Sequence, residues 1–505
     1  MKLLPSSPDL SHLKRQAKRL LRAALAGEDS ALRRLGEARV VTPPRLHDAQ
    51  LVVAREYGFR SWAELKRYVE WKHGPGAERL ERLTAWMLDG GPAERRLALR
   101  LLGEEPELLA DDPWLACMAG DEARLYTALA TIPDFANRNG GPRAMPPLVA
   151  ITHSRLVLET DKEQALLACA RLLLRHGADV NSSWTDPRWP DSRLSALYGA
   201  AGRNRHPGMT KLLLEAGADP NDNESLYHSV ESSDDTCTRL LLDAGARVIG
   251  TNAIGRVLDF DRLDRLRLLL RHGGGAAAEH PWIHHAIRRG RSLEHVQALI
   301  DAGADLHATG HGGQGLYRWA LLHGRTDVAA LLRKHGLEEE LEDGDAFVAA
   351  CACGDEPAAR AIAARTADIF AELTDWQLRT LPRLAAIGDL RAVRTMLALG
   401  WPREVRAEWD ATALNLAVFQ GDAEMARLLL AQDADWRTPH GFGDNVLGTL
   451  SFASRAEDIG DPAPRDYAGC ARALLDYGVP PSAFQGYTFS TTVSTHLEAR
   501  NDSHA

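Results

Sequence analysis

Residues 412–435 read TALNLAVFQGDAEMARLLLAQDAD, and this stretch decides the fold class. Apolar residues recur on both sides of Gly421. A glycine accepts the left-handed backbone conformation that ends a helix and turns the chain. The stretch therefore predicts two short antiparallel helices with a tight turn between them.

The end of this stretch recurs along the chain as an apolar triplet, two variable residues and then Gly. Clear copies are LLLRHGADVN, LLLEAGADPN, LLLDAGARVI, LLLRHGGG and ALIDAGADLH, and weaker copies end near residues 336, 400, 433 and 478. One interval, between Gly336 and Gly400, has double length and predicts a further repeat, which residues 345–367 supply as DAFVAACACGDEPAARAIAARTA. Two intervals hold insertions: SSWTDPRWPDSR at 182–193, an enlarged finger, and RAEDIGDPAPRD at 455–466, a loop.

The pattern resembles the ankyrin-repeat family, whose unit begins near T-P-L-H-x-A-A, turns at Gly and ends L-L-x-x-G-A-D. Residues 412–435 match it best, and LYRWALLHGRTDVAALLRKHG at 316–336 matches its second half. Residues 47–70 and 196–231 look like segments of bacterial ankyrin-repeat proteins. The resemblance implies an all-α solenoid of about eleven helix-turn-helix repeats with an N-terminal helical capping domain. One unit cannot bury its own apolar face, so stacking of neighbours provides the core.

We expect four regions: a basic helical cap at 1–75, a helical transition segment at 76–111, the solenoid at 112–485 and a polar tail at 486–505. The cap carries 15 basic against 8 acidic residues, whereas the whole chain has a net charge of −9. Its first helix is expected to begin at Ser7-Pro8, and Ser61 with Glu64 forms a predicted capping box. Its expected core residues are Leu20, Leu21, Val52, Trp62 and Leu65.

Composition excludes several classes of protein. The 505 residues are 45% hydrophobic and 6% aromatic, which is typical of a folded and mostly helical chain. Six cysteines are scattered through apolar segments instead of forming a disulfide pattern, which favours a reducing compartment. No apolar run is long enough for a membrane span, and the N-terminus lacks the apolar core of a signal peptide. We expect a cytoplasmic monomer that does not act on membranes.

Sequence motifs for chemistry are missing as well. The chain has no nucleophile elbow, phosphate-binding loop, dinucleotide fingerprint or His-Glu-x-x-His pair, so we expect neither an enzyme nor a cofactor. His284 falls where the ankyrin pattern has a structural, hydrogen-bonding histidine. Five histidines lie within about one repeat, and such a cluster suggests zinc binding as an alternative. No Cys or carboxylate completes a ligand spacing, so we expect no metal. The five histidines are His280, His284, His285, His307 and His311.

The basic run from Lys14 to Arg22 can attract an acidic partner or nucleic acid, although no aromatic stacking platform accompanies it. We interpret it as a solvated helix face and do not expect nucleic acid as the partner.

Protein binding is the leading hypothesis: a scaffold, adaptor or inhibitor that holds a partner protein through its fingers and concave face. In the family, specificity comes from variable finger and inner-helix positions, and aromatic rings with neighbouring Arg are typical of binding hot spots. The positions selected here are Trp184, Arg188, Trp189, Trp282, His307, His311, Tyr317, Trp436, His440 and Phe442. For the tryptophans, the alternative is that they seal gaps between repeats. The alternative function is a metal-dependent hydrolase or small-molecule-binding protein that uses the His-rich middle repeats.

Overall fold

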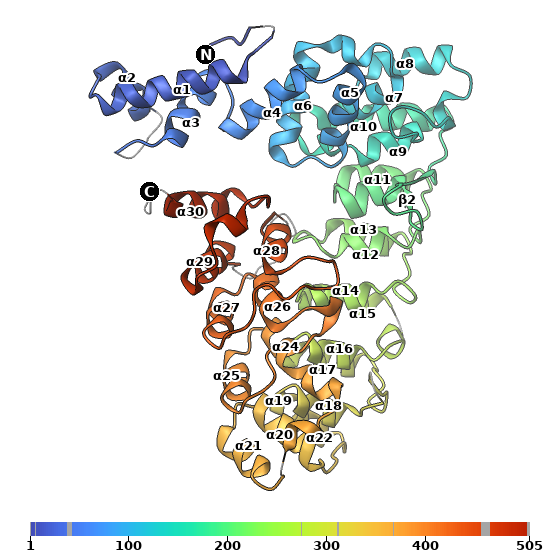
Figure 1. Ribbon diagram of the computed structural model, residues 1–505. Coiled ribbons are helices and arrows are strands. Elements are labelled where there is room, and N and C mark those ends of the chain that lie inside the picture. The colour runs from blue at the N-terminus through green and yellow to red at the C-terminus, as the bar shows by residue number, and fades with distance from the viewer. Residues whose placement is uncertain are drawn as a thin grey trace. The chain divides into compact units, whose positions relative to one another are not determined.

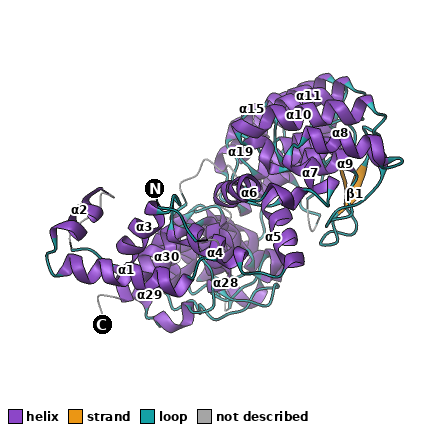
Figure 2. Ribbon diagram, turned by 90° about the horizontal axis from the view of Figure 1, so that it is seen from above, coloured by secondary structure: helices purple, strands orange, loops and turns teal. Residues whose placement is uncertain are grey.

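The computed structural model describes residues 2–5, 7–37, 43–273, 275–310, 313–366, 368–455 and 465–501, and these are mostly helical with very little strand (Figures 1 and 2). The described strands are β1 (Ser183–Thr185) and β2 (Arg193–Ser195), an antiparallel pair drawn in orange in Figure 2. The chain forms two compact units. Unit 1 comprises Met1–Ser229 and Thr236–Ala246, and unit 2 comprises Val230–Asp235 and Arg247–Ala505.

Unit 1 begins with four helices of the cap and continues with helix pairs. Its α-helices are α1 (Leu10–Leu25), α2 (Asp29–Glu37), α3 (Leu46–Glu56), α4 (Trp62–Lys72), α5 (Gly76–Leu88), α6 (Pro92–Glu104), α7 (Pro113–Ala119), α8 (Glu122–Thr131), α9 (Pro147–His153), α10 (Thr160–Arg175), α11 (Pro207–Glu215), α12 (Ser225–Ser229) and α13 (Thr236–Asp243). Short 3-10 turns η1 (Pro106–Leu109), η2 (Phe135–Asn137) and η3 (Arg155–Leu158) connect some of them, and η4 (Tyr198–Arg203) is a π-helix that pairs with α11.

The cap differs from its prediction at the first helix. Asp9, not Ser7, is the N-cap of α1, because its Oδ1 accepts the Ser11 amide at 2.7 Å. One half of the expected capping box of α4 is confirmed, since the Ser61 hydroxyl accepts the Glu64 amide at 3.1 Å. The Glu64 side chain accepts the Arg60 amide at 2.7 Å instead of the Ser61 amide. Of the expected core, Leu20, Val52 and Leu65 are buried, whereas Leu21 and Trp62 are half-buried.

Unit 2 continues the helix pairs. Its α-helices are α14 (Ala253–Asp259), α15 (Leu263–His272), α16 (Trp282–Arg288), α17 (Leu293–Asp301), α18 (Leu316–Leu322), α19 (Thr326–Lys334), α20 (Asp343–Ala352), α21 (Glu356–Ala363), α22 (Ile369–Glu372), α23 (Asp375–Leu378), α24 (Thr380–Ala386), α25 (Leu390–Ala398), α26 (Ala413–Gln420), α27 (Ala423–Leu430), α28 (Val446–Arg455), α29 (Tyr467–Tyr477) and α30 (Thr491–Asn501). The 3-10 turns are η5 (Ala276–Ala278), η6 (Glu408–Asp410) and η7 (Pro481–Phe484). Residues 456–464 of the predicted loop lie outside the described residues.

The pair α26 and α27 shows why the repeated phrase folds as it does. Gly421 ends α26 in the left-handed conformation at φ +70°, and Asp422 begins α27 by accepting the amides of Glu424 and Met425. At the end of the pair, Asp433 occupies the position that Gly holds in other copies. It adopts φ +60°, and its amide donates to the carbonyl of Leu430 at 2.9 Å. This left-handed turn satisfies carbonyls that the helix end leaves open.

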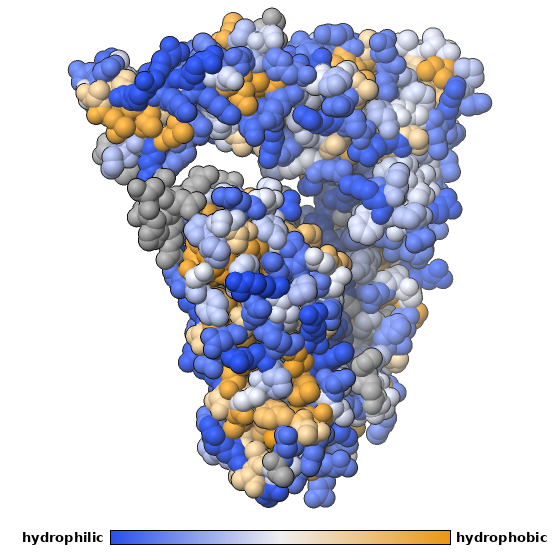
Figure 3. All heavy atoms as spheres, in the orientation of Figure 1, coloured by the Kyte–Doolittle hydropathy of each residue, from blue (hydrophilic) through white to orange (hydrophobic). Residues whose placement is uncertain are grey.

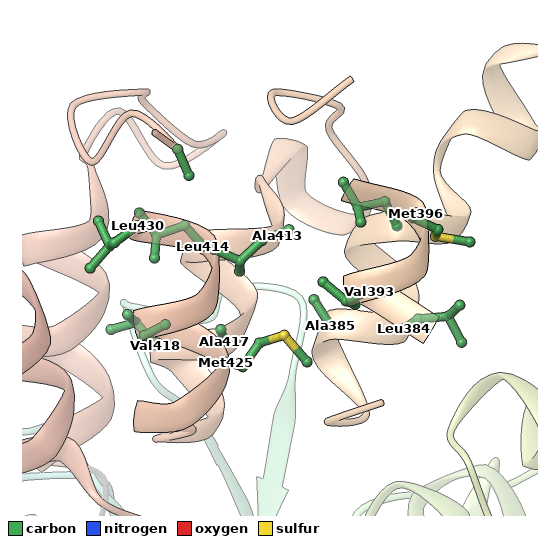
Figure 4. Close-up of a cluster of buried hydrophobic side chains, with 14 of the residues drawn as sticks. Leu384, Ala385, Val393, Met396, Ala413, Leu414, Ala417, Val418, Met425 and Leu430 are labelled. Carbon is green, nitrogen blue, oxygen red and sulfur yellow. The ribbon is translucent and has the colours of Figure 1, made fainter. Parts of the chain in front are cut away.

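Stacking of successive pairs forms the core of unit 2. Figure 4 shows Leu384 and Ala385 of α24 and Val393 and Met396 of α25 beside the side chains of α26 and α27. The labelled residues are at most 2% exposed, and burial of each Leu or Val side chain stabilises the fold by about 1.5–3 kcal/mol. The pair α20 and α21 occupies the interval of double length, where a further repeat is expected. On the face seen in Figure 3, apolar side chains gather over α20 to α22.

The C-terminal segment predicted as a polar tail contains α30, which packs on α29 and buries Val493 completely. In the middle of unit 2, two turns that are distant in sequence touch. A Cβ at Gly290 would lie 3.3 Å from Ile387, and the ion pair between Arg288 and Glu408 joins positions 120 residues apart. The repeats around α16 and α24 are therefore in direct contact within unit 2.

Candidate functional site

Two neighbouring fingers of unit 2 bring three aromatic rings together. The turn η6 carries Trp409, and the finger that precedes α28 carries His440 and Phe442. The Trp409 ring centroid lies 6.0 Å from that of Phe442 and 5.3 Å from that of His440. Phe442 is 79% exposed. We call Trp409, His440 and Phe442 the aromatic cluster.

The backbone holds the two fingers of the aromatic cluster in contact. The Gly441 amide donates to the Trp409 carbonyl at 2.8 Å, and the His440 amide donates to the Asp444 carbonyl at 2.8 Å. A Cβ at Gly441 would lie 2.8 Å from the Trp409 oxygen, so this approach requires glycine. Trp409 itself adopts φ +45°, which is strained for a bulky residue. Such strain persists only where the surrounding structure imposes it, and it is a recognised feature of functional sites.

The aromatic cluster is also anchored and uncharged. The Trp409 ring packs 5.6 Å from the ring of Phe419 on α26. Burial lowers the pKa of His440 below its ordinary value, although the nearby Asp444 charge opposes this effect. The imidazole is consequently neutral at pH 7, and the cluster presents a rigid apolar surface of the type found at binding hot spots.

Four of the predicted interface residues are buried: Trp184, Trp282, Tyr317 and His440, which is 8% exposed within the aromatic cluster. Trp184 is 9% exposed, and its indole Nε1 donates to the Arg143 carbonyl at 2.9 Å. Trp282 and Tyr317 are each 6% exposed. These side chains pack inside the units. For the two tryptophans this agrees with the alternative interpretation, that they seal gaps between repeats.

The enlarged finger of unit 1 contains β1 and ends at Arg193, where β2 begins. Arg188 forms ion pairs that fix the finger: its Nη2 lies 2.6 Å from Oδ2 of the buried Asp186 and 3.4 Å from Oδ1 of Asp89. The hydrogen bond from Arg188 lowers the pKa of the Asp186 carboxyl. Trp189 is 66% exposed beside it. The finger therefore offers Trp189 to a partner, while Arg188 holds the finger in place.

The remaining predicted positions are separate from one another. His307 is exposed, and Trp436 is half-buried with the Arg437 guanidinium 4.5 Å from its ring centroid. His311 lies outside the described residues. The aromatic cluster thus joins His440 and Phe442 to Trp409, a finger residue that the predicted interface did not include.

The histidines of the middle repeats make separate hydrogen bonds. Nε2 of His284 lies 3.0 Å from the Gln314 carbonyl of the next finger, and Nε2 of His285 lies 2.9 Å from Oδ1 of Asp259. Within the described part of the chain, no group of three or more His, Cys, Asp or Glu residues could hold a metal ion. His284 makes the kind of bond that the ankyrin pattern assigns to its histidine.

A hollow of about 370 Å³ lies beside these histidines in unit 2. Side chains from α16, α18, α24 and η6 meet there, and α16 and α24 run side by side in Figure 1. Its lining residues are Pro281, His284, His285, Arg288, Gly310, Trp319, Arg379, Arg383, Ala407 and Glu408. We call this feature the cationic hollow, because three guanidinium groups and one carboxylate line it.

The basic helix α1 behaves as a solvated face. Its cations at positions 14, 15, 18, 19 and 22 are all exposed, and its opposite side buries Leu13, Ala17 and Leu20. Arg15 lies 3.6 Å from Asp9, and both side chains are about 60% exposed, so this pair contributes little.

No protein-family model matches this sequence, and a comparison with curated proteins finds no match either. Among solved structures, the chain is similar to the crystal structure of the human ASB11 ankyrin repeat domain. The two share 20% sequence identity with a TM-score of 0.22, over 45% of this chain and 98% of that chain. At this TM-score the likeness carries no weight, and the repeat architecture rests on the helix pairs themselves. None of the described helices is long and apolar enough to cross a membrane.

Proposed function

We propose that this chain is an ankyrin-type repeat protein that acts as a non-catalytic protein-interaction module. The observation that carries the proposal is the aromatic cluster, in which Phe442 is 79% exposed beside the strained Trp409. Burial of large, rigid aromatic rings at a partner's surface gives much of the binding energy in protein interfaces. A loop held in a strained conformation by glycine-dependent backbone contacts loses little further freedom when a partner binds.

Other finger residues offer separate contacts in the proposal. They are the exposed Trp189 in unit 1 and, in unit 2, the exposed His307 and the half-buried Trp436. The buried Trp184, Trp282 and Tyr317 are not part of it, because a partner cannot reach them. Within the aromatic cluster, Phe442 is the ring that a partner reaches, and the buried His440 supports it from below. The module acts as a scaffold, adaptor or inhibitor, and we propose that it is a cytoplasmic monomer.

Capture of partners from a lysate of the source organism tests the proposal. The tagged full chain is compared with the double variant Trp409→Ala/Phe442→Ala and with Phe452→Ala, a control at another exposed phenylalanine of unit 2 that is 61% exposed. We expect one protein to be enriched by the wild type and the control and lost from the double variant. Equal enrichment by all three would contradict the proposed site, and no specific enrichment would contradict the proposed function.

The second candidate is a small-molecule-binding protein, and the cationic hollow favours it. Its volume of about 370 Å³ is within the range of ligand sites, about 300–1,000 Å³, and it combines an aromatic wall with converging polar groups. A metal-dependent hydrolase has less support, because the described histidines bond to other groups instead of converging on one point. Metal analysis of the purified protein and of His307→Ala distinguishes the small-molecule-binding protein from the metal-dependent hydrolase. A stoichiometric metal ion that is lost in the variant supports the hydrolase.

A further inference from the structure

The cationic hollow has an aromatic base. The Trp319 side chain is 2% exposed, and its ring centroid lies 5.3 Å from the ring of His284 and 5.3 Å from the ring of Trp376. Its indole Nε1 donates to the His284 carbonyl at 3.0 Å, so the indole has no free donor to offer a ligand. A Cβ at Gly310 would lie 2.3 Å from the His284 ring, so the absence of a side chain there leaves the ring in place. The base is therefore rigid and largely apolar.

The walls of the hollow carry more positive than negative charge. Arg288 pairs with Glu408, and its Nη2 lies 3.2 Å from Nδ1 of His285. Glu408 is the sole carboxylate among the lining residues. Within the described residues, neither Arg379 nor Arg383 lies within ion-pair distance of any carboxylate. Two guanidinium charges are thus left over after the internal pair is formed.

Arg383 is held in this position by Trp376. Its guanidinium lies 4.8 Å from the Trp376 ring centroid, and its Nη1 donates to the Trp376 carbonyl at 3.3 Å. Arg379 is the N-cap of α24 and precedes Arg383 by four residues, and both side chains line the hollow. Like charges at this spacing destabilise a helix when nothing compensates them. Burial, together with the charges of Arg288 and Arg379, lowers the pKa of Arg383 to about 10, against the opposing charge of Glu408.

We propose that the cationic hollow binds a phosphate monoester, with Arg379 and Arg383 as its two guanidinium ligands. A phosphate monoester carries about two negative charges at neutral pH, which matches the two unpaired cations, whereas a carboxylate carries one. Guanidinium groups bind phosphate oxygens through two parallel hydrogen bonds each. The remaining room and the apolar base suit the organic part of the ester. The inference rests on the second candidate function, a small-molecule site, and is independent of the aromatic cluster.

Calorimetric titration of the purified full chain tests the inference. The probes are phenyl phosphate, benzoate and a peptide that contains phosphotyrosine. The variants are Arg379→Ala and Arg383→Met, and Arg472→Ala serves as a control because Arg472 is an exposed arginine of α29 in the same unit. We expect saturable binding of phenyl phosphate, at least tenfold weaker in both variants and unchanged in the control. Binding should weaken as salt rises, since it is electrostatic.

The other outcomes are equally decisive. No binding of phenyl phosphate at millimolar concentration, or binding that both variants retain, would overturn the inference. Benzoate binding as tight as that of phenyl phosphate would overturn the assignment to phosphate while leaving a small-molecule site. A phosphotyrosine peptide that binds at least tenfold tighter than phenyl phosphate, and fails to bind both variants, supports the site and identifies a phosphorylated protein as the source. Equal affinity supports a free small molecule.

Discussion

Removal of the Arg383 charge is expected to stabilise the protein when no anion is bound. The pKa of Arg383 falls from the ordinary value of an arginine to about 10 in the folded chain, chiefly because the side chain is buried. Since each tenfold change in a protonation equilibrium is worth about 1.4 kcal/mol, the charged guanidinium costs on the order of 3 kcal/mol. The contacts of Arg383 with Trp376 offset part of this free-energy cost: about 0.5–1 kcal/mol from the cation stacked on the indole ring and about 1 kcal/mol from the hydrogen bond. Arg383→Met keeps an apolar stem of similar length.

The net expectation is that Arg383→Met raises the free energy of unfolding by about 1–2 kcal/mol at pH 7. The sign follows from the lowered pKa: the cost is fully present at any pH below about 10, and it disappears only as pH rises from there towards the ordinary pKa of an arginine. Urea unfolding of the wild type, Arg383→Met and the control Arg472→Met provides the measurement. A control change within about 0.5 kcal/mol is expected for an exposed residue. Destabilisation of Arg383→Met by more than about 1 kcal/mol would refute the reasoning, since the contacts with Trp376 would then outweigh the buried charge.

Three further outcomes follow from the packing of the chain. Trp184→Ala should lower the free energy of unfolding by about 3–5 kcal/mol, and Trp189→Ala should change it by less than about 0.5 kcal/mol; equal effects in thermal unfolding would contradict the burial of Trp184. Gly324→Ala should destabilise the protein by at least about 1 kcal/mol more than Gly336→Ala. Both glycines have positive φ, but only at Gly324 would a new Cβ meet the next repeat, 2.4 Å from the Ala352 oxygen. Equal unfolding midpoints of the two variants would contradict that contact. Burial raises the pKa of the Cys169, Cys351 and Cys470 thiols to about 12. These three cysteines should therefore react slowly with iodoacetamide at pH 7 in the folded chain and fully in urea, as followed by mass spectrometry of the peptides. Fast alkylation of these three cysteines in the folded chain would contradict their burial.

Much of the helical organisation could be predicted because it depends on local chemistry. Glycine at the turn and at the end of a unit, together with apolar spacing, indicated where helices begin and end, and the double interval indicated the pair α20 and α21. The position of the first helix of the cap was missed by two residues, because Ser7 and Asp9 both suit an N-cap and the sequence does not decide between them. The helix α30 was also missed, since its burial depends on contact with α29.

The candidate sites were harder to predict because they depend on contacts between distant residues. Periodicity placed Trp184 in a finger, but a finger can fold its ring inward, as the hydrogen bond to Arg143 shows. The cationic hollow joins residues about 100 positions apart, and no local motif marks it. Its one sequence signal is Arg379 and Arg383, two like charges four residues apart at the start of a mostly apolar segment.

The most direct test of the protein-interaction proposal is amide hydrogen exchange of the full chain with and without its captured partner. Exchange reports which backbone segments a partner covers, and no substitution is needed. The account predicts added protection at 405–411 and 438–444, the two fingers that carry the aromatic cluster. Protection confined to the second helices of the repeats, such as α25 and α27, with these fingers unchanged, would contradict it.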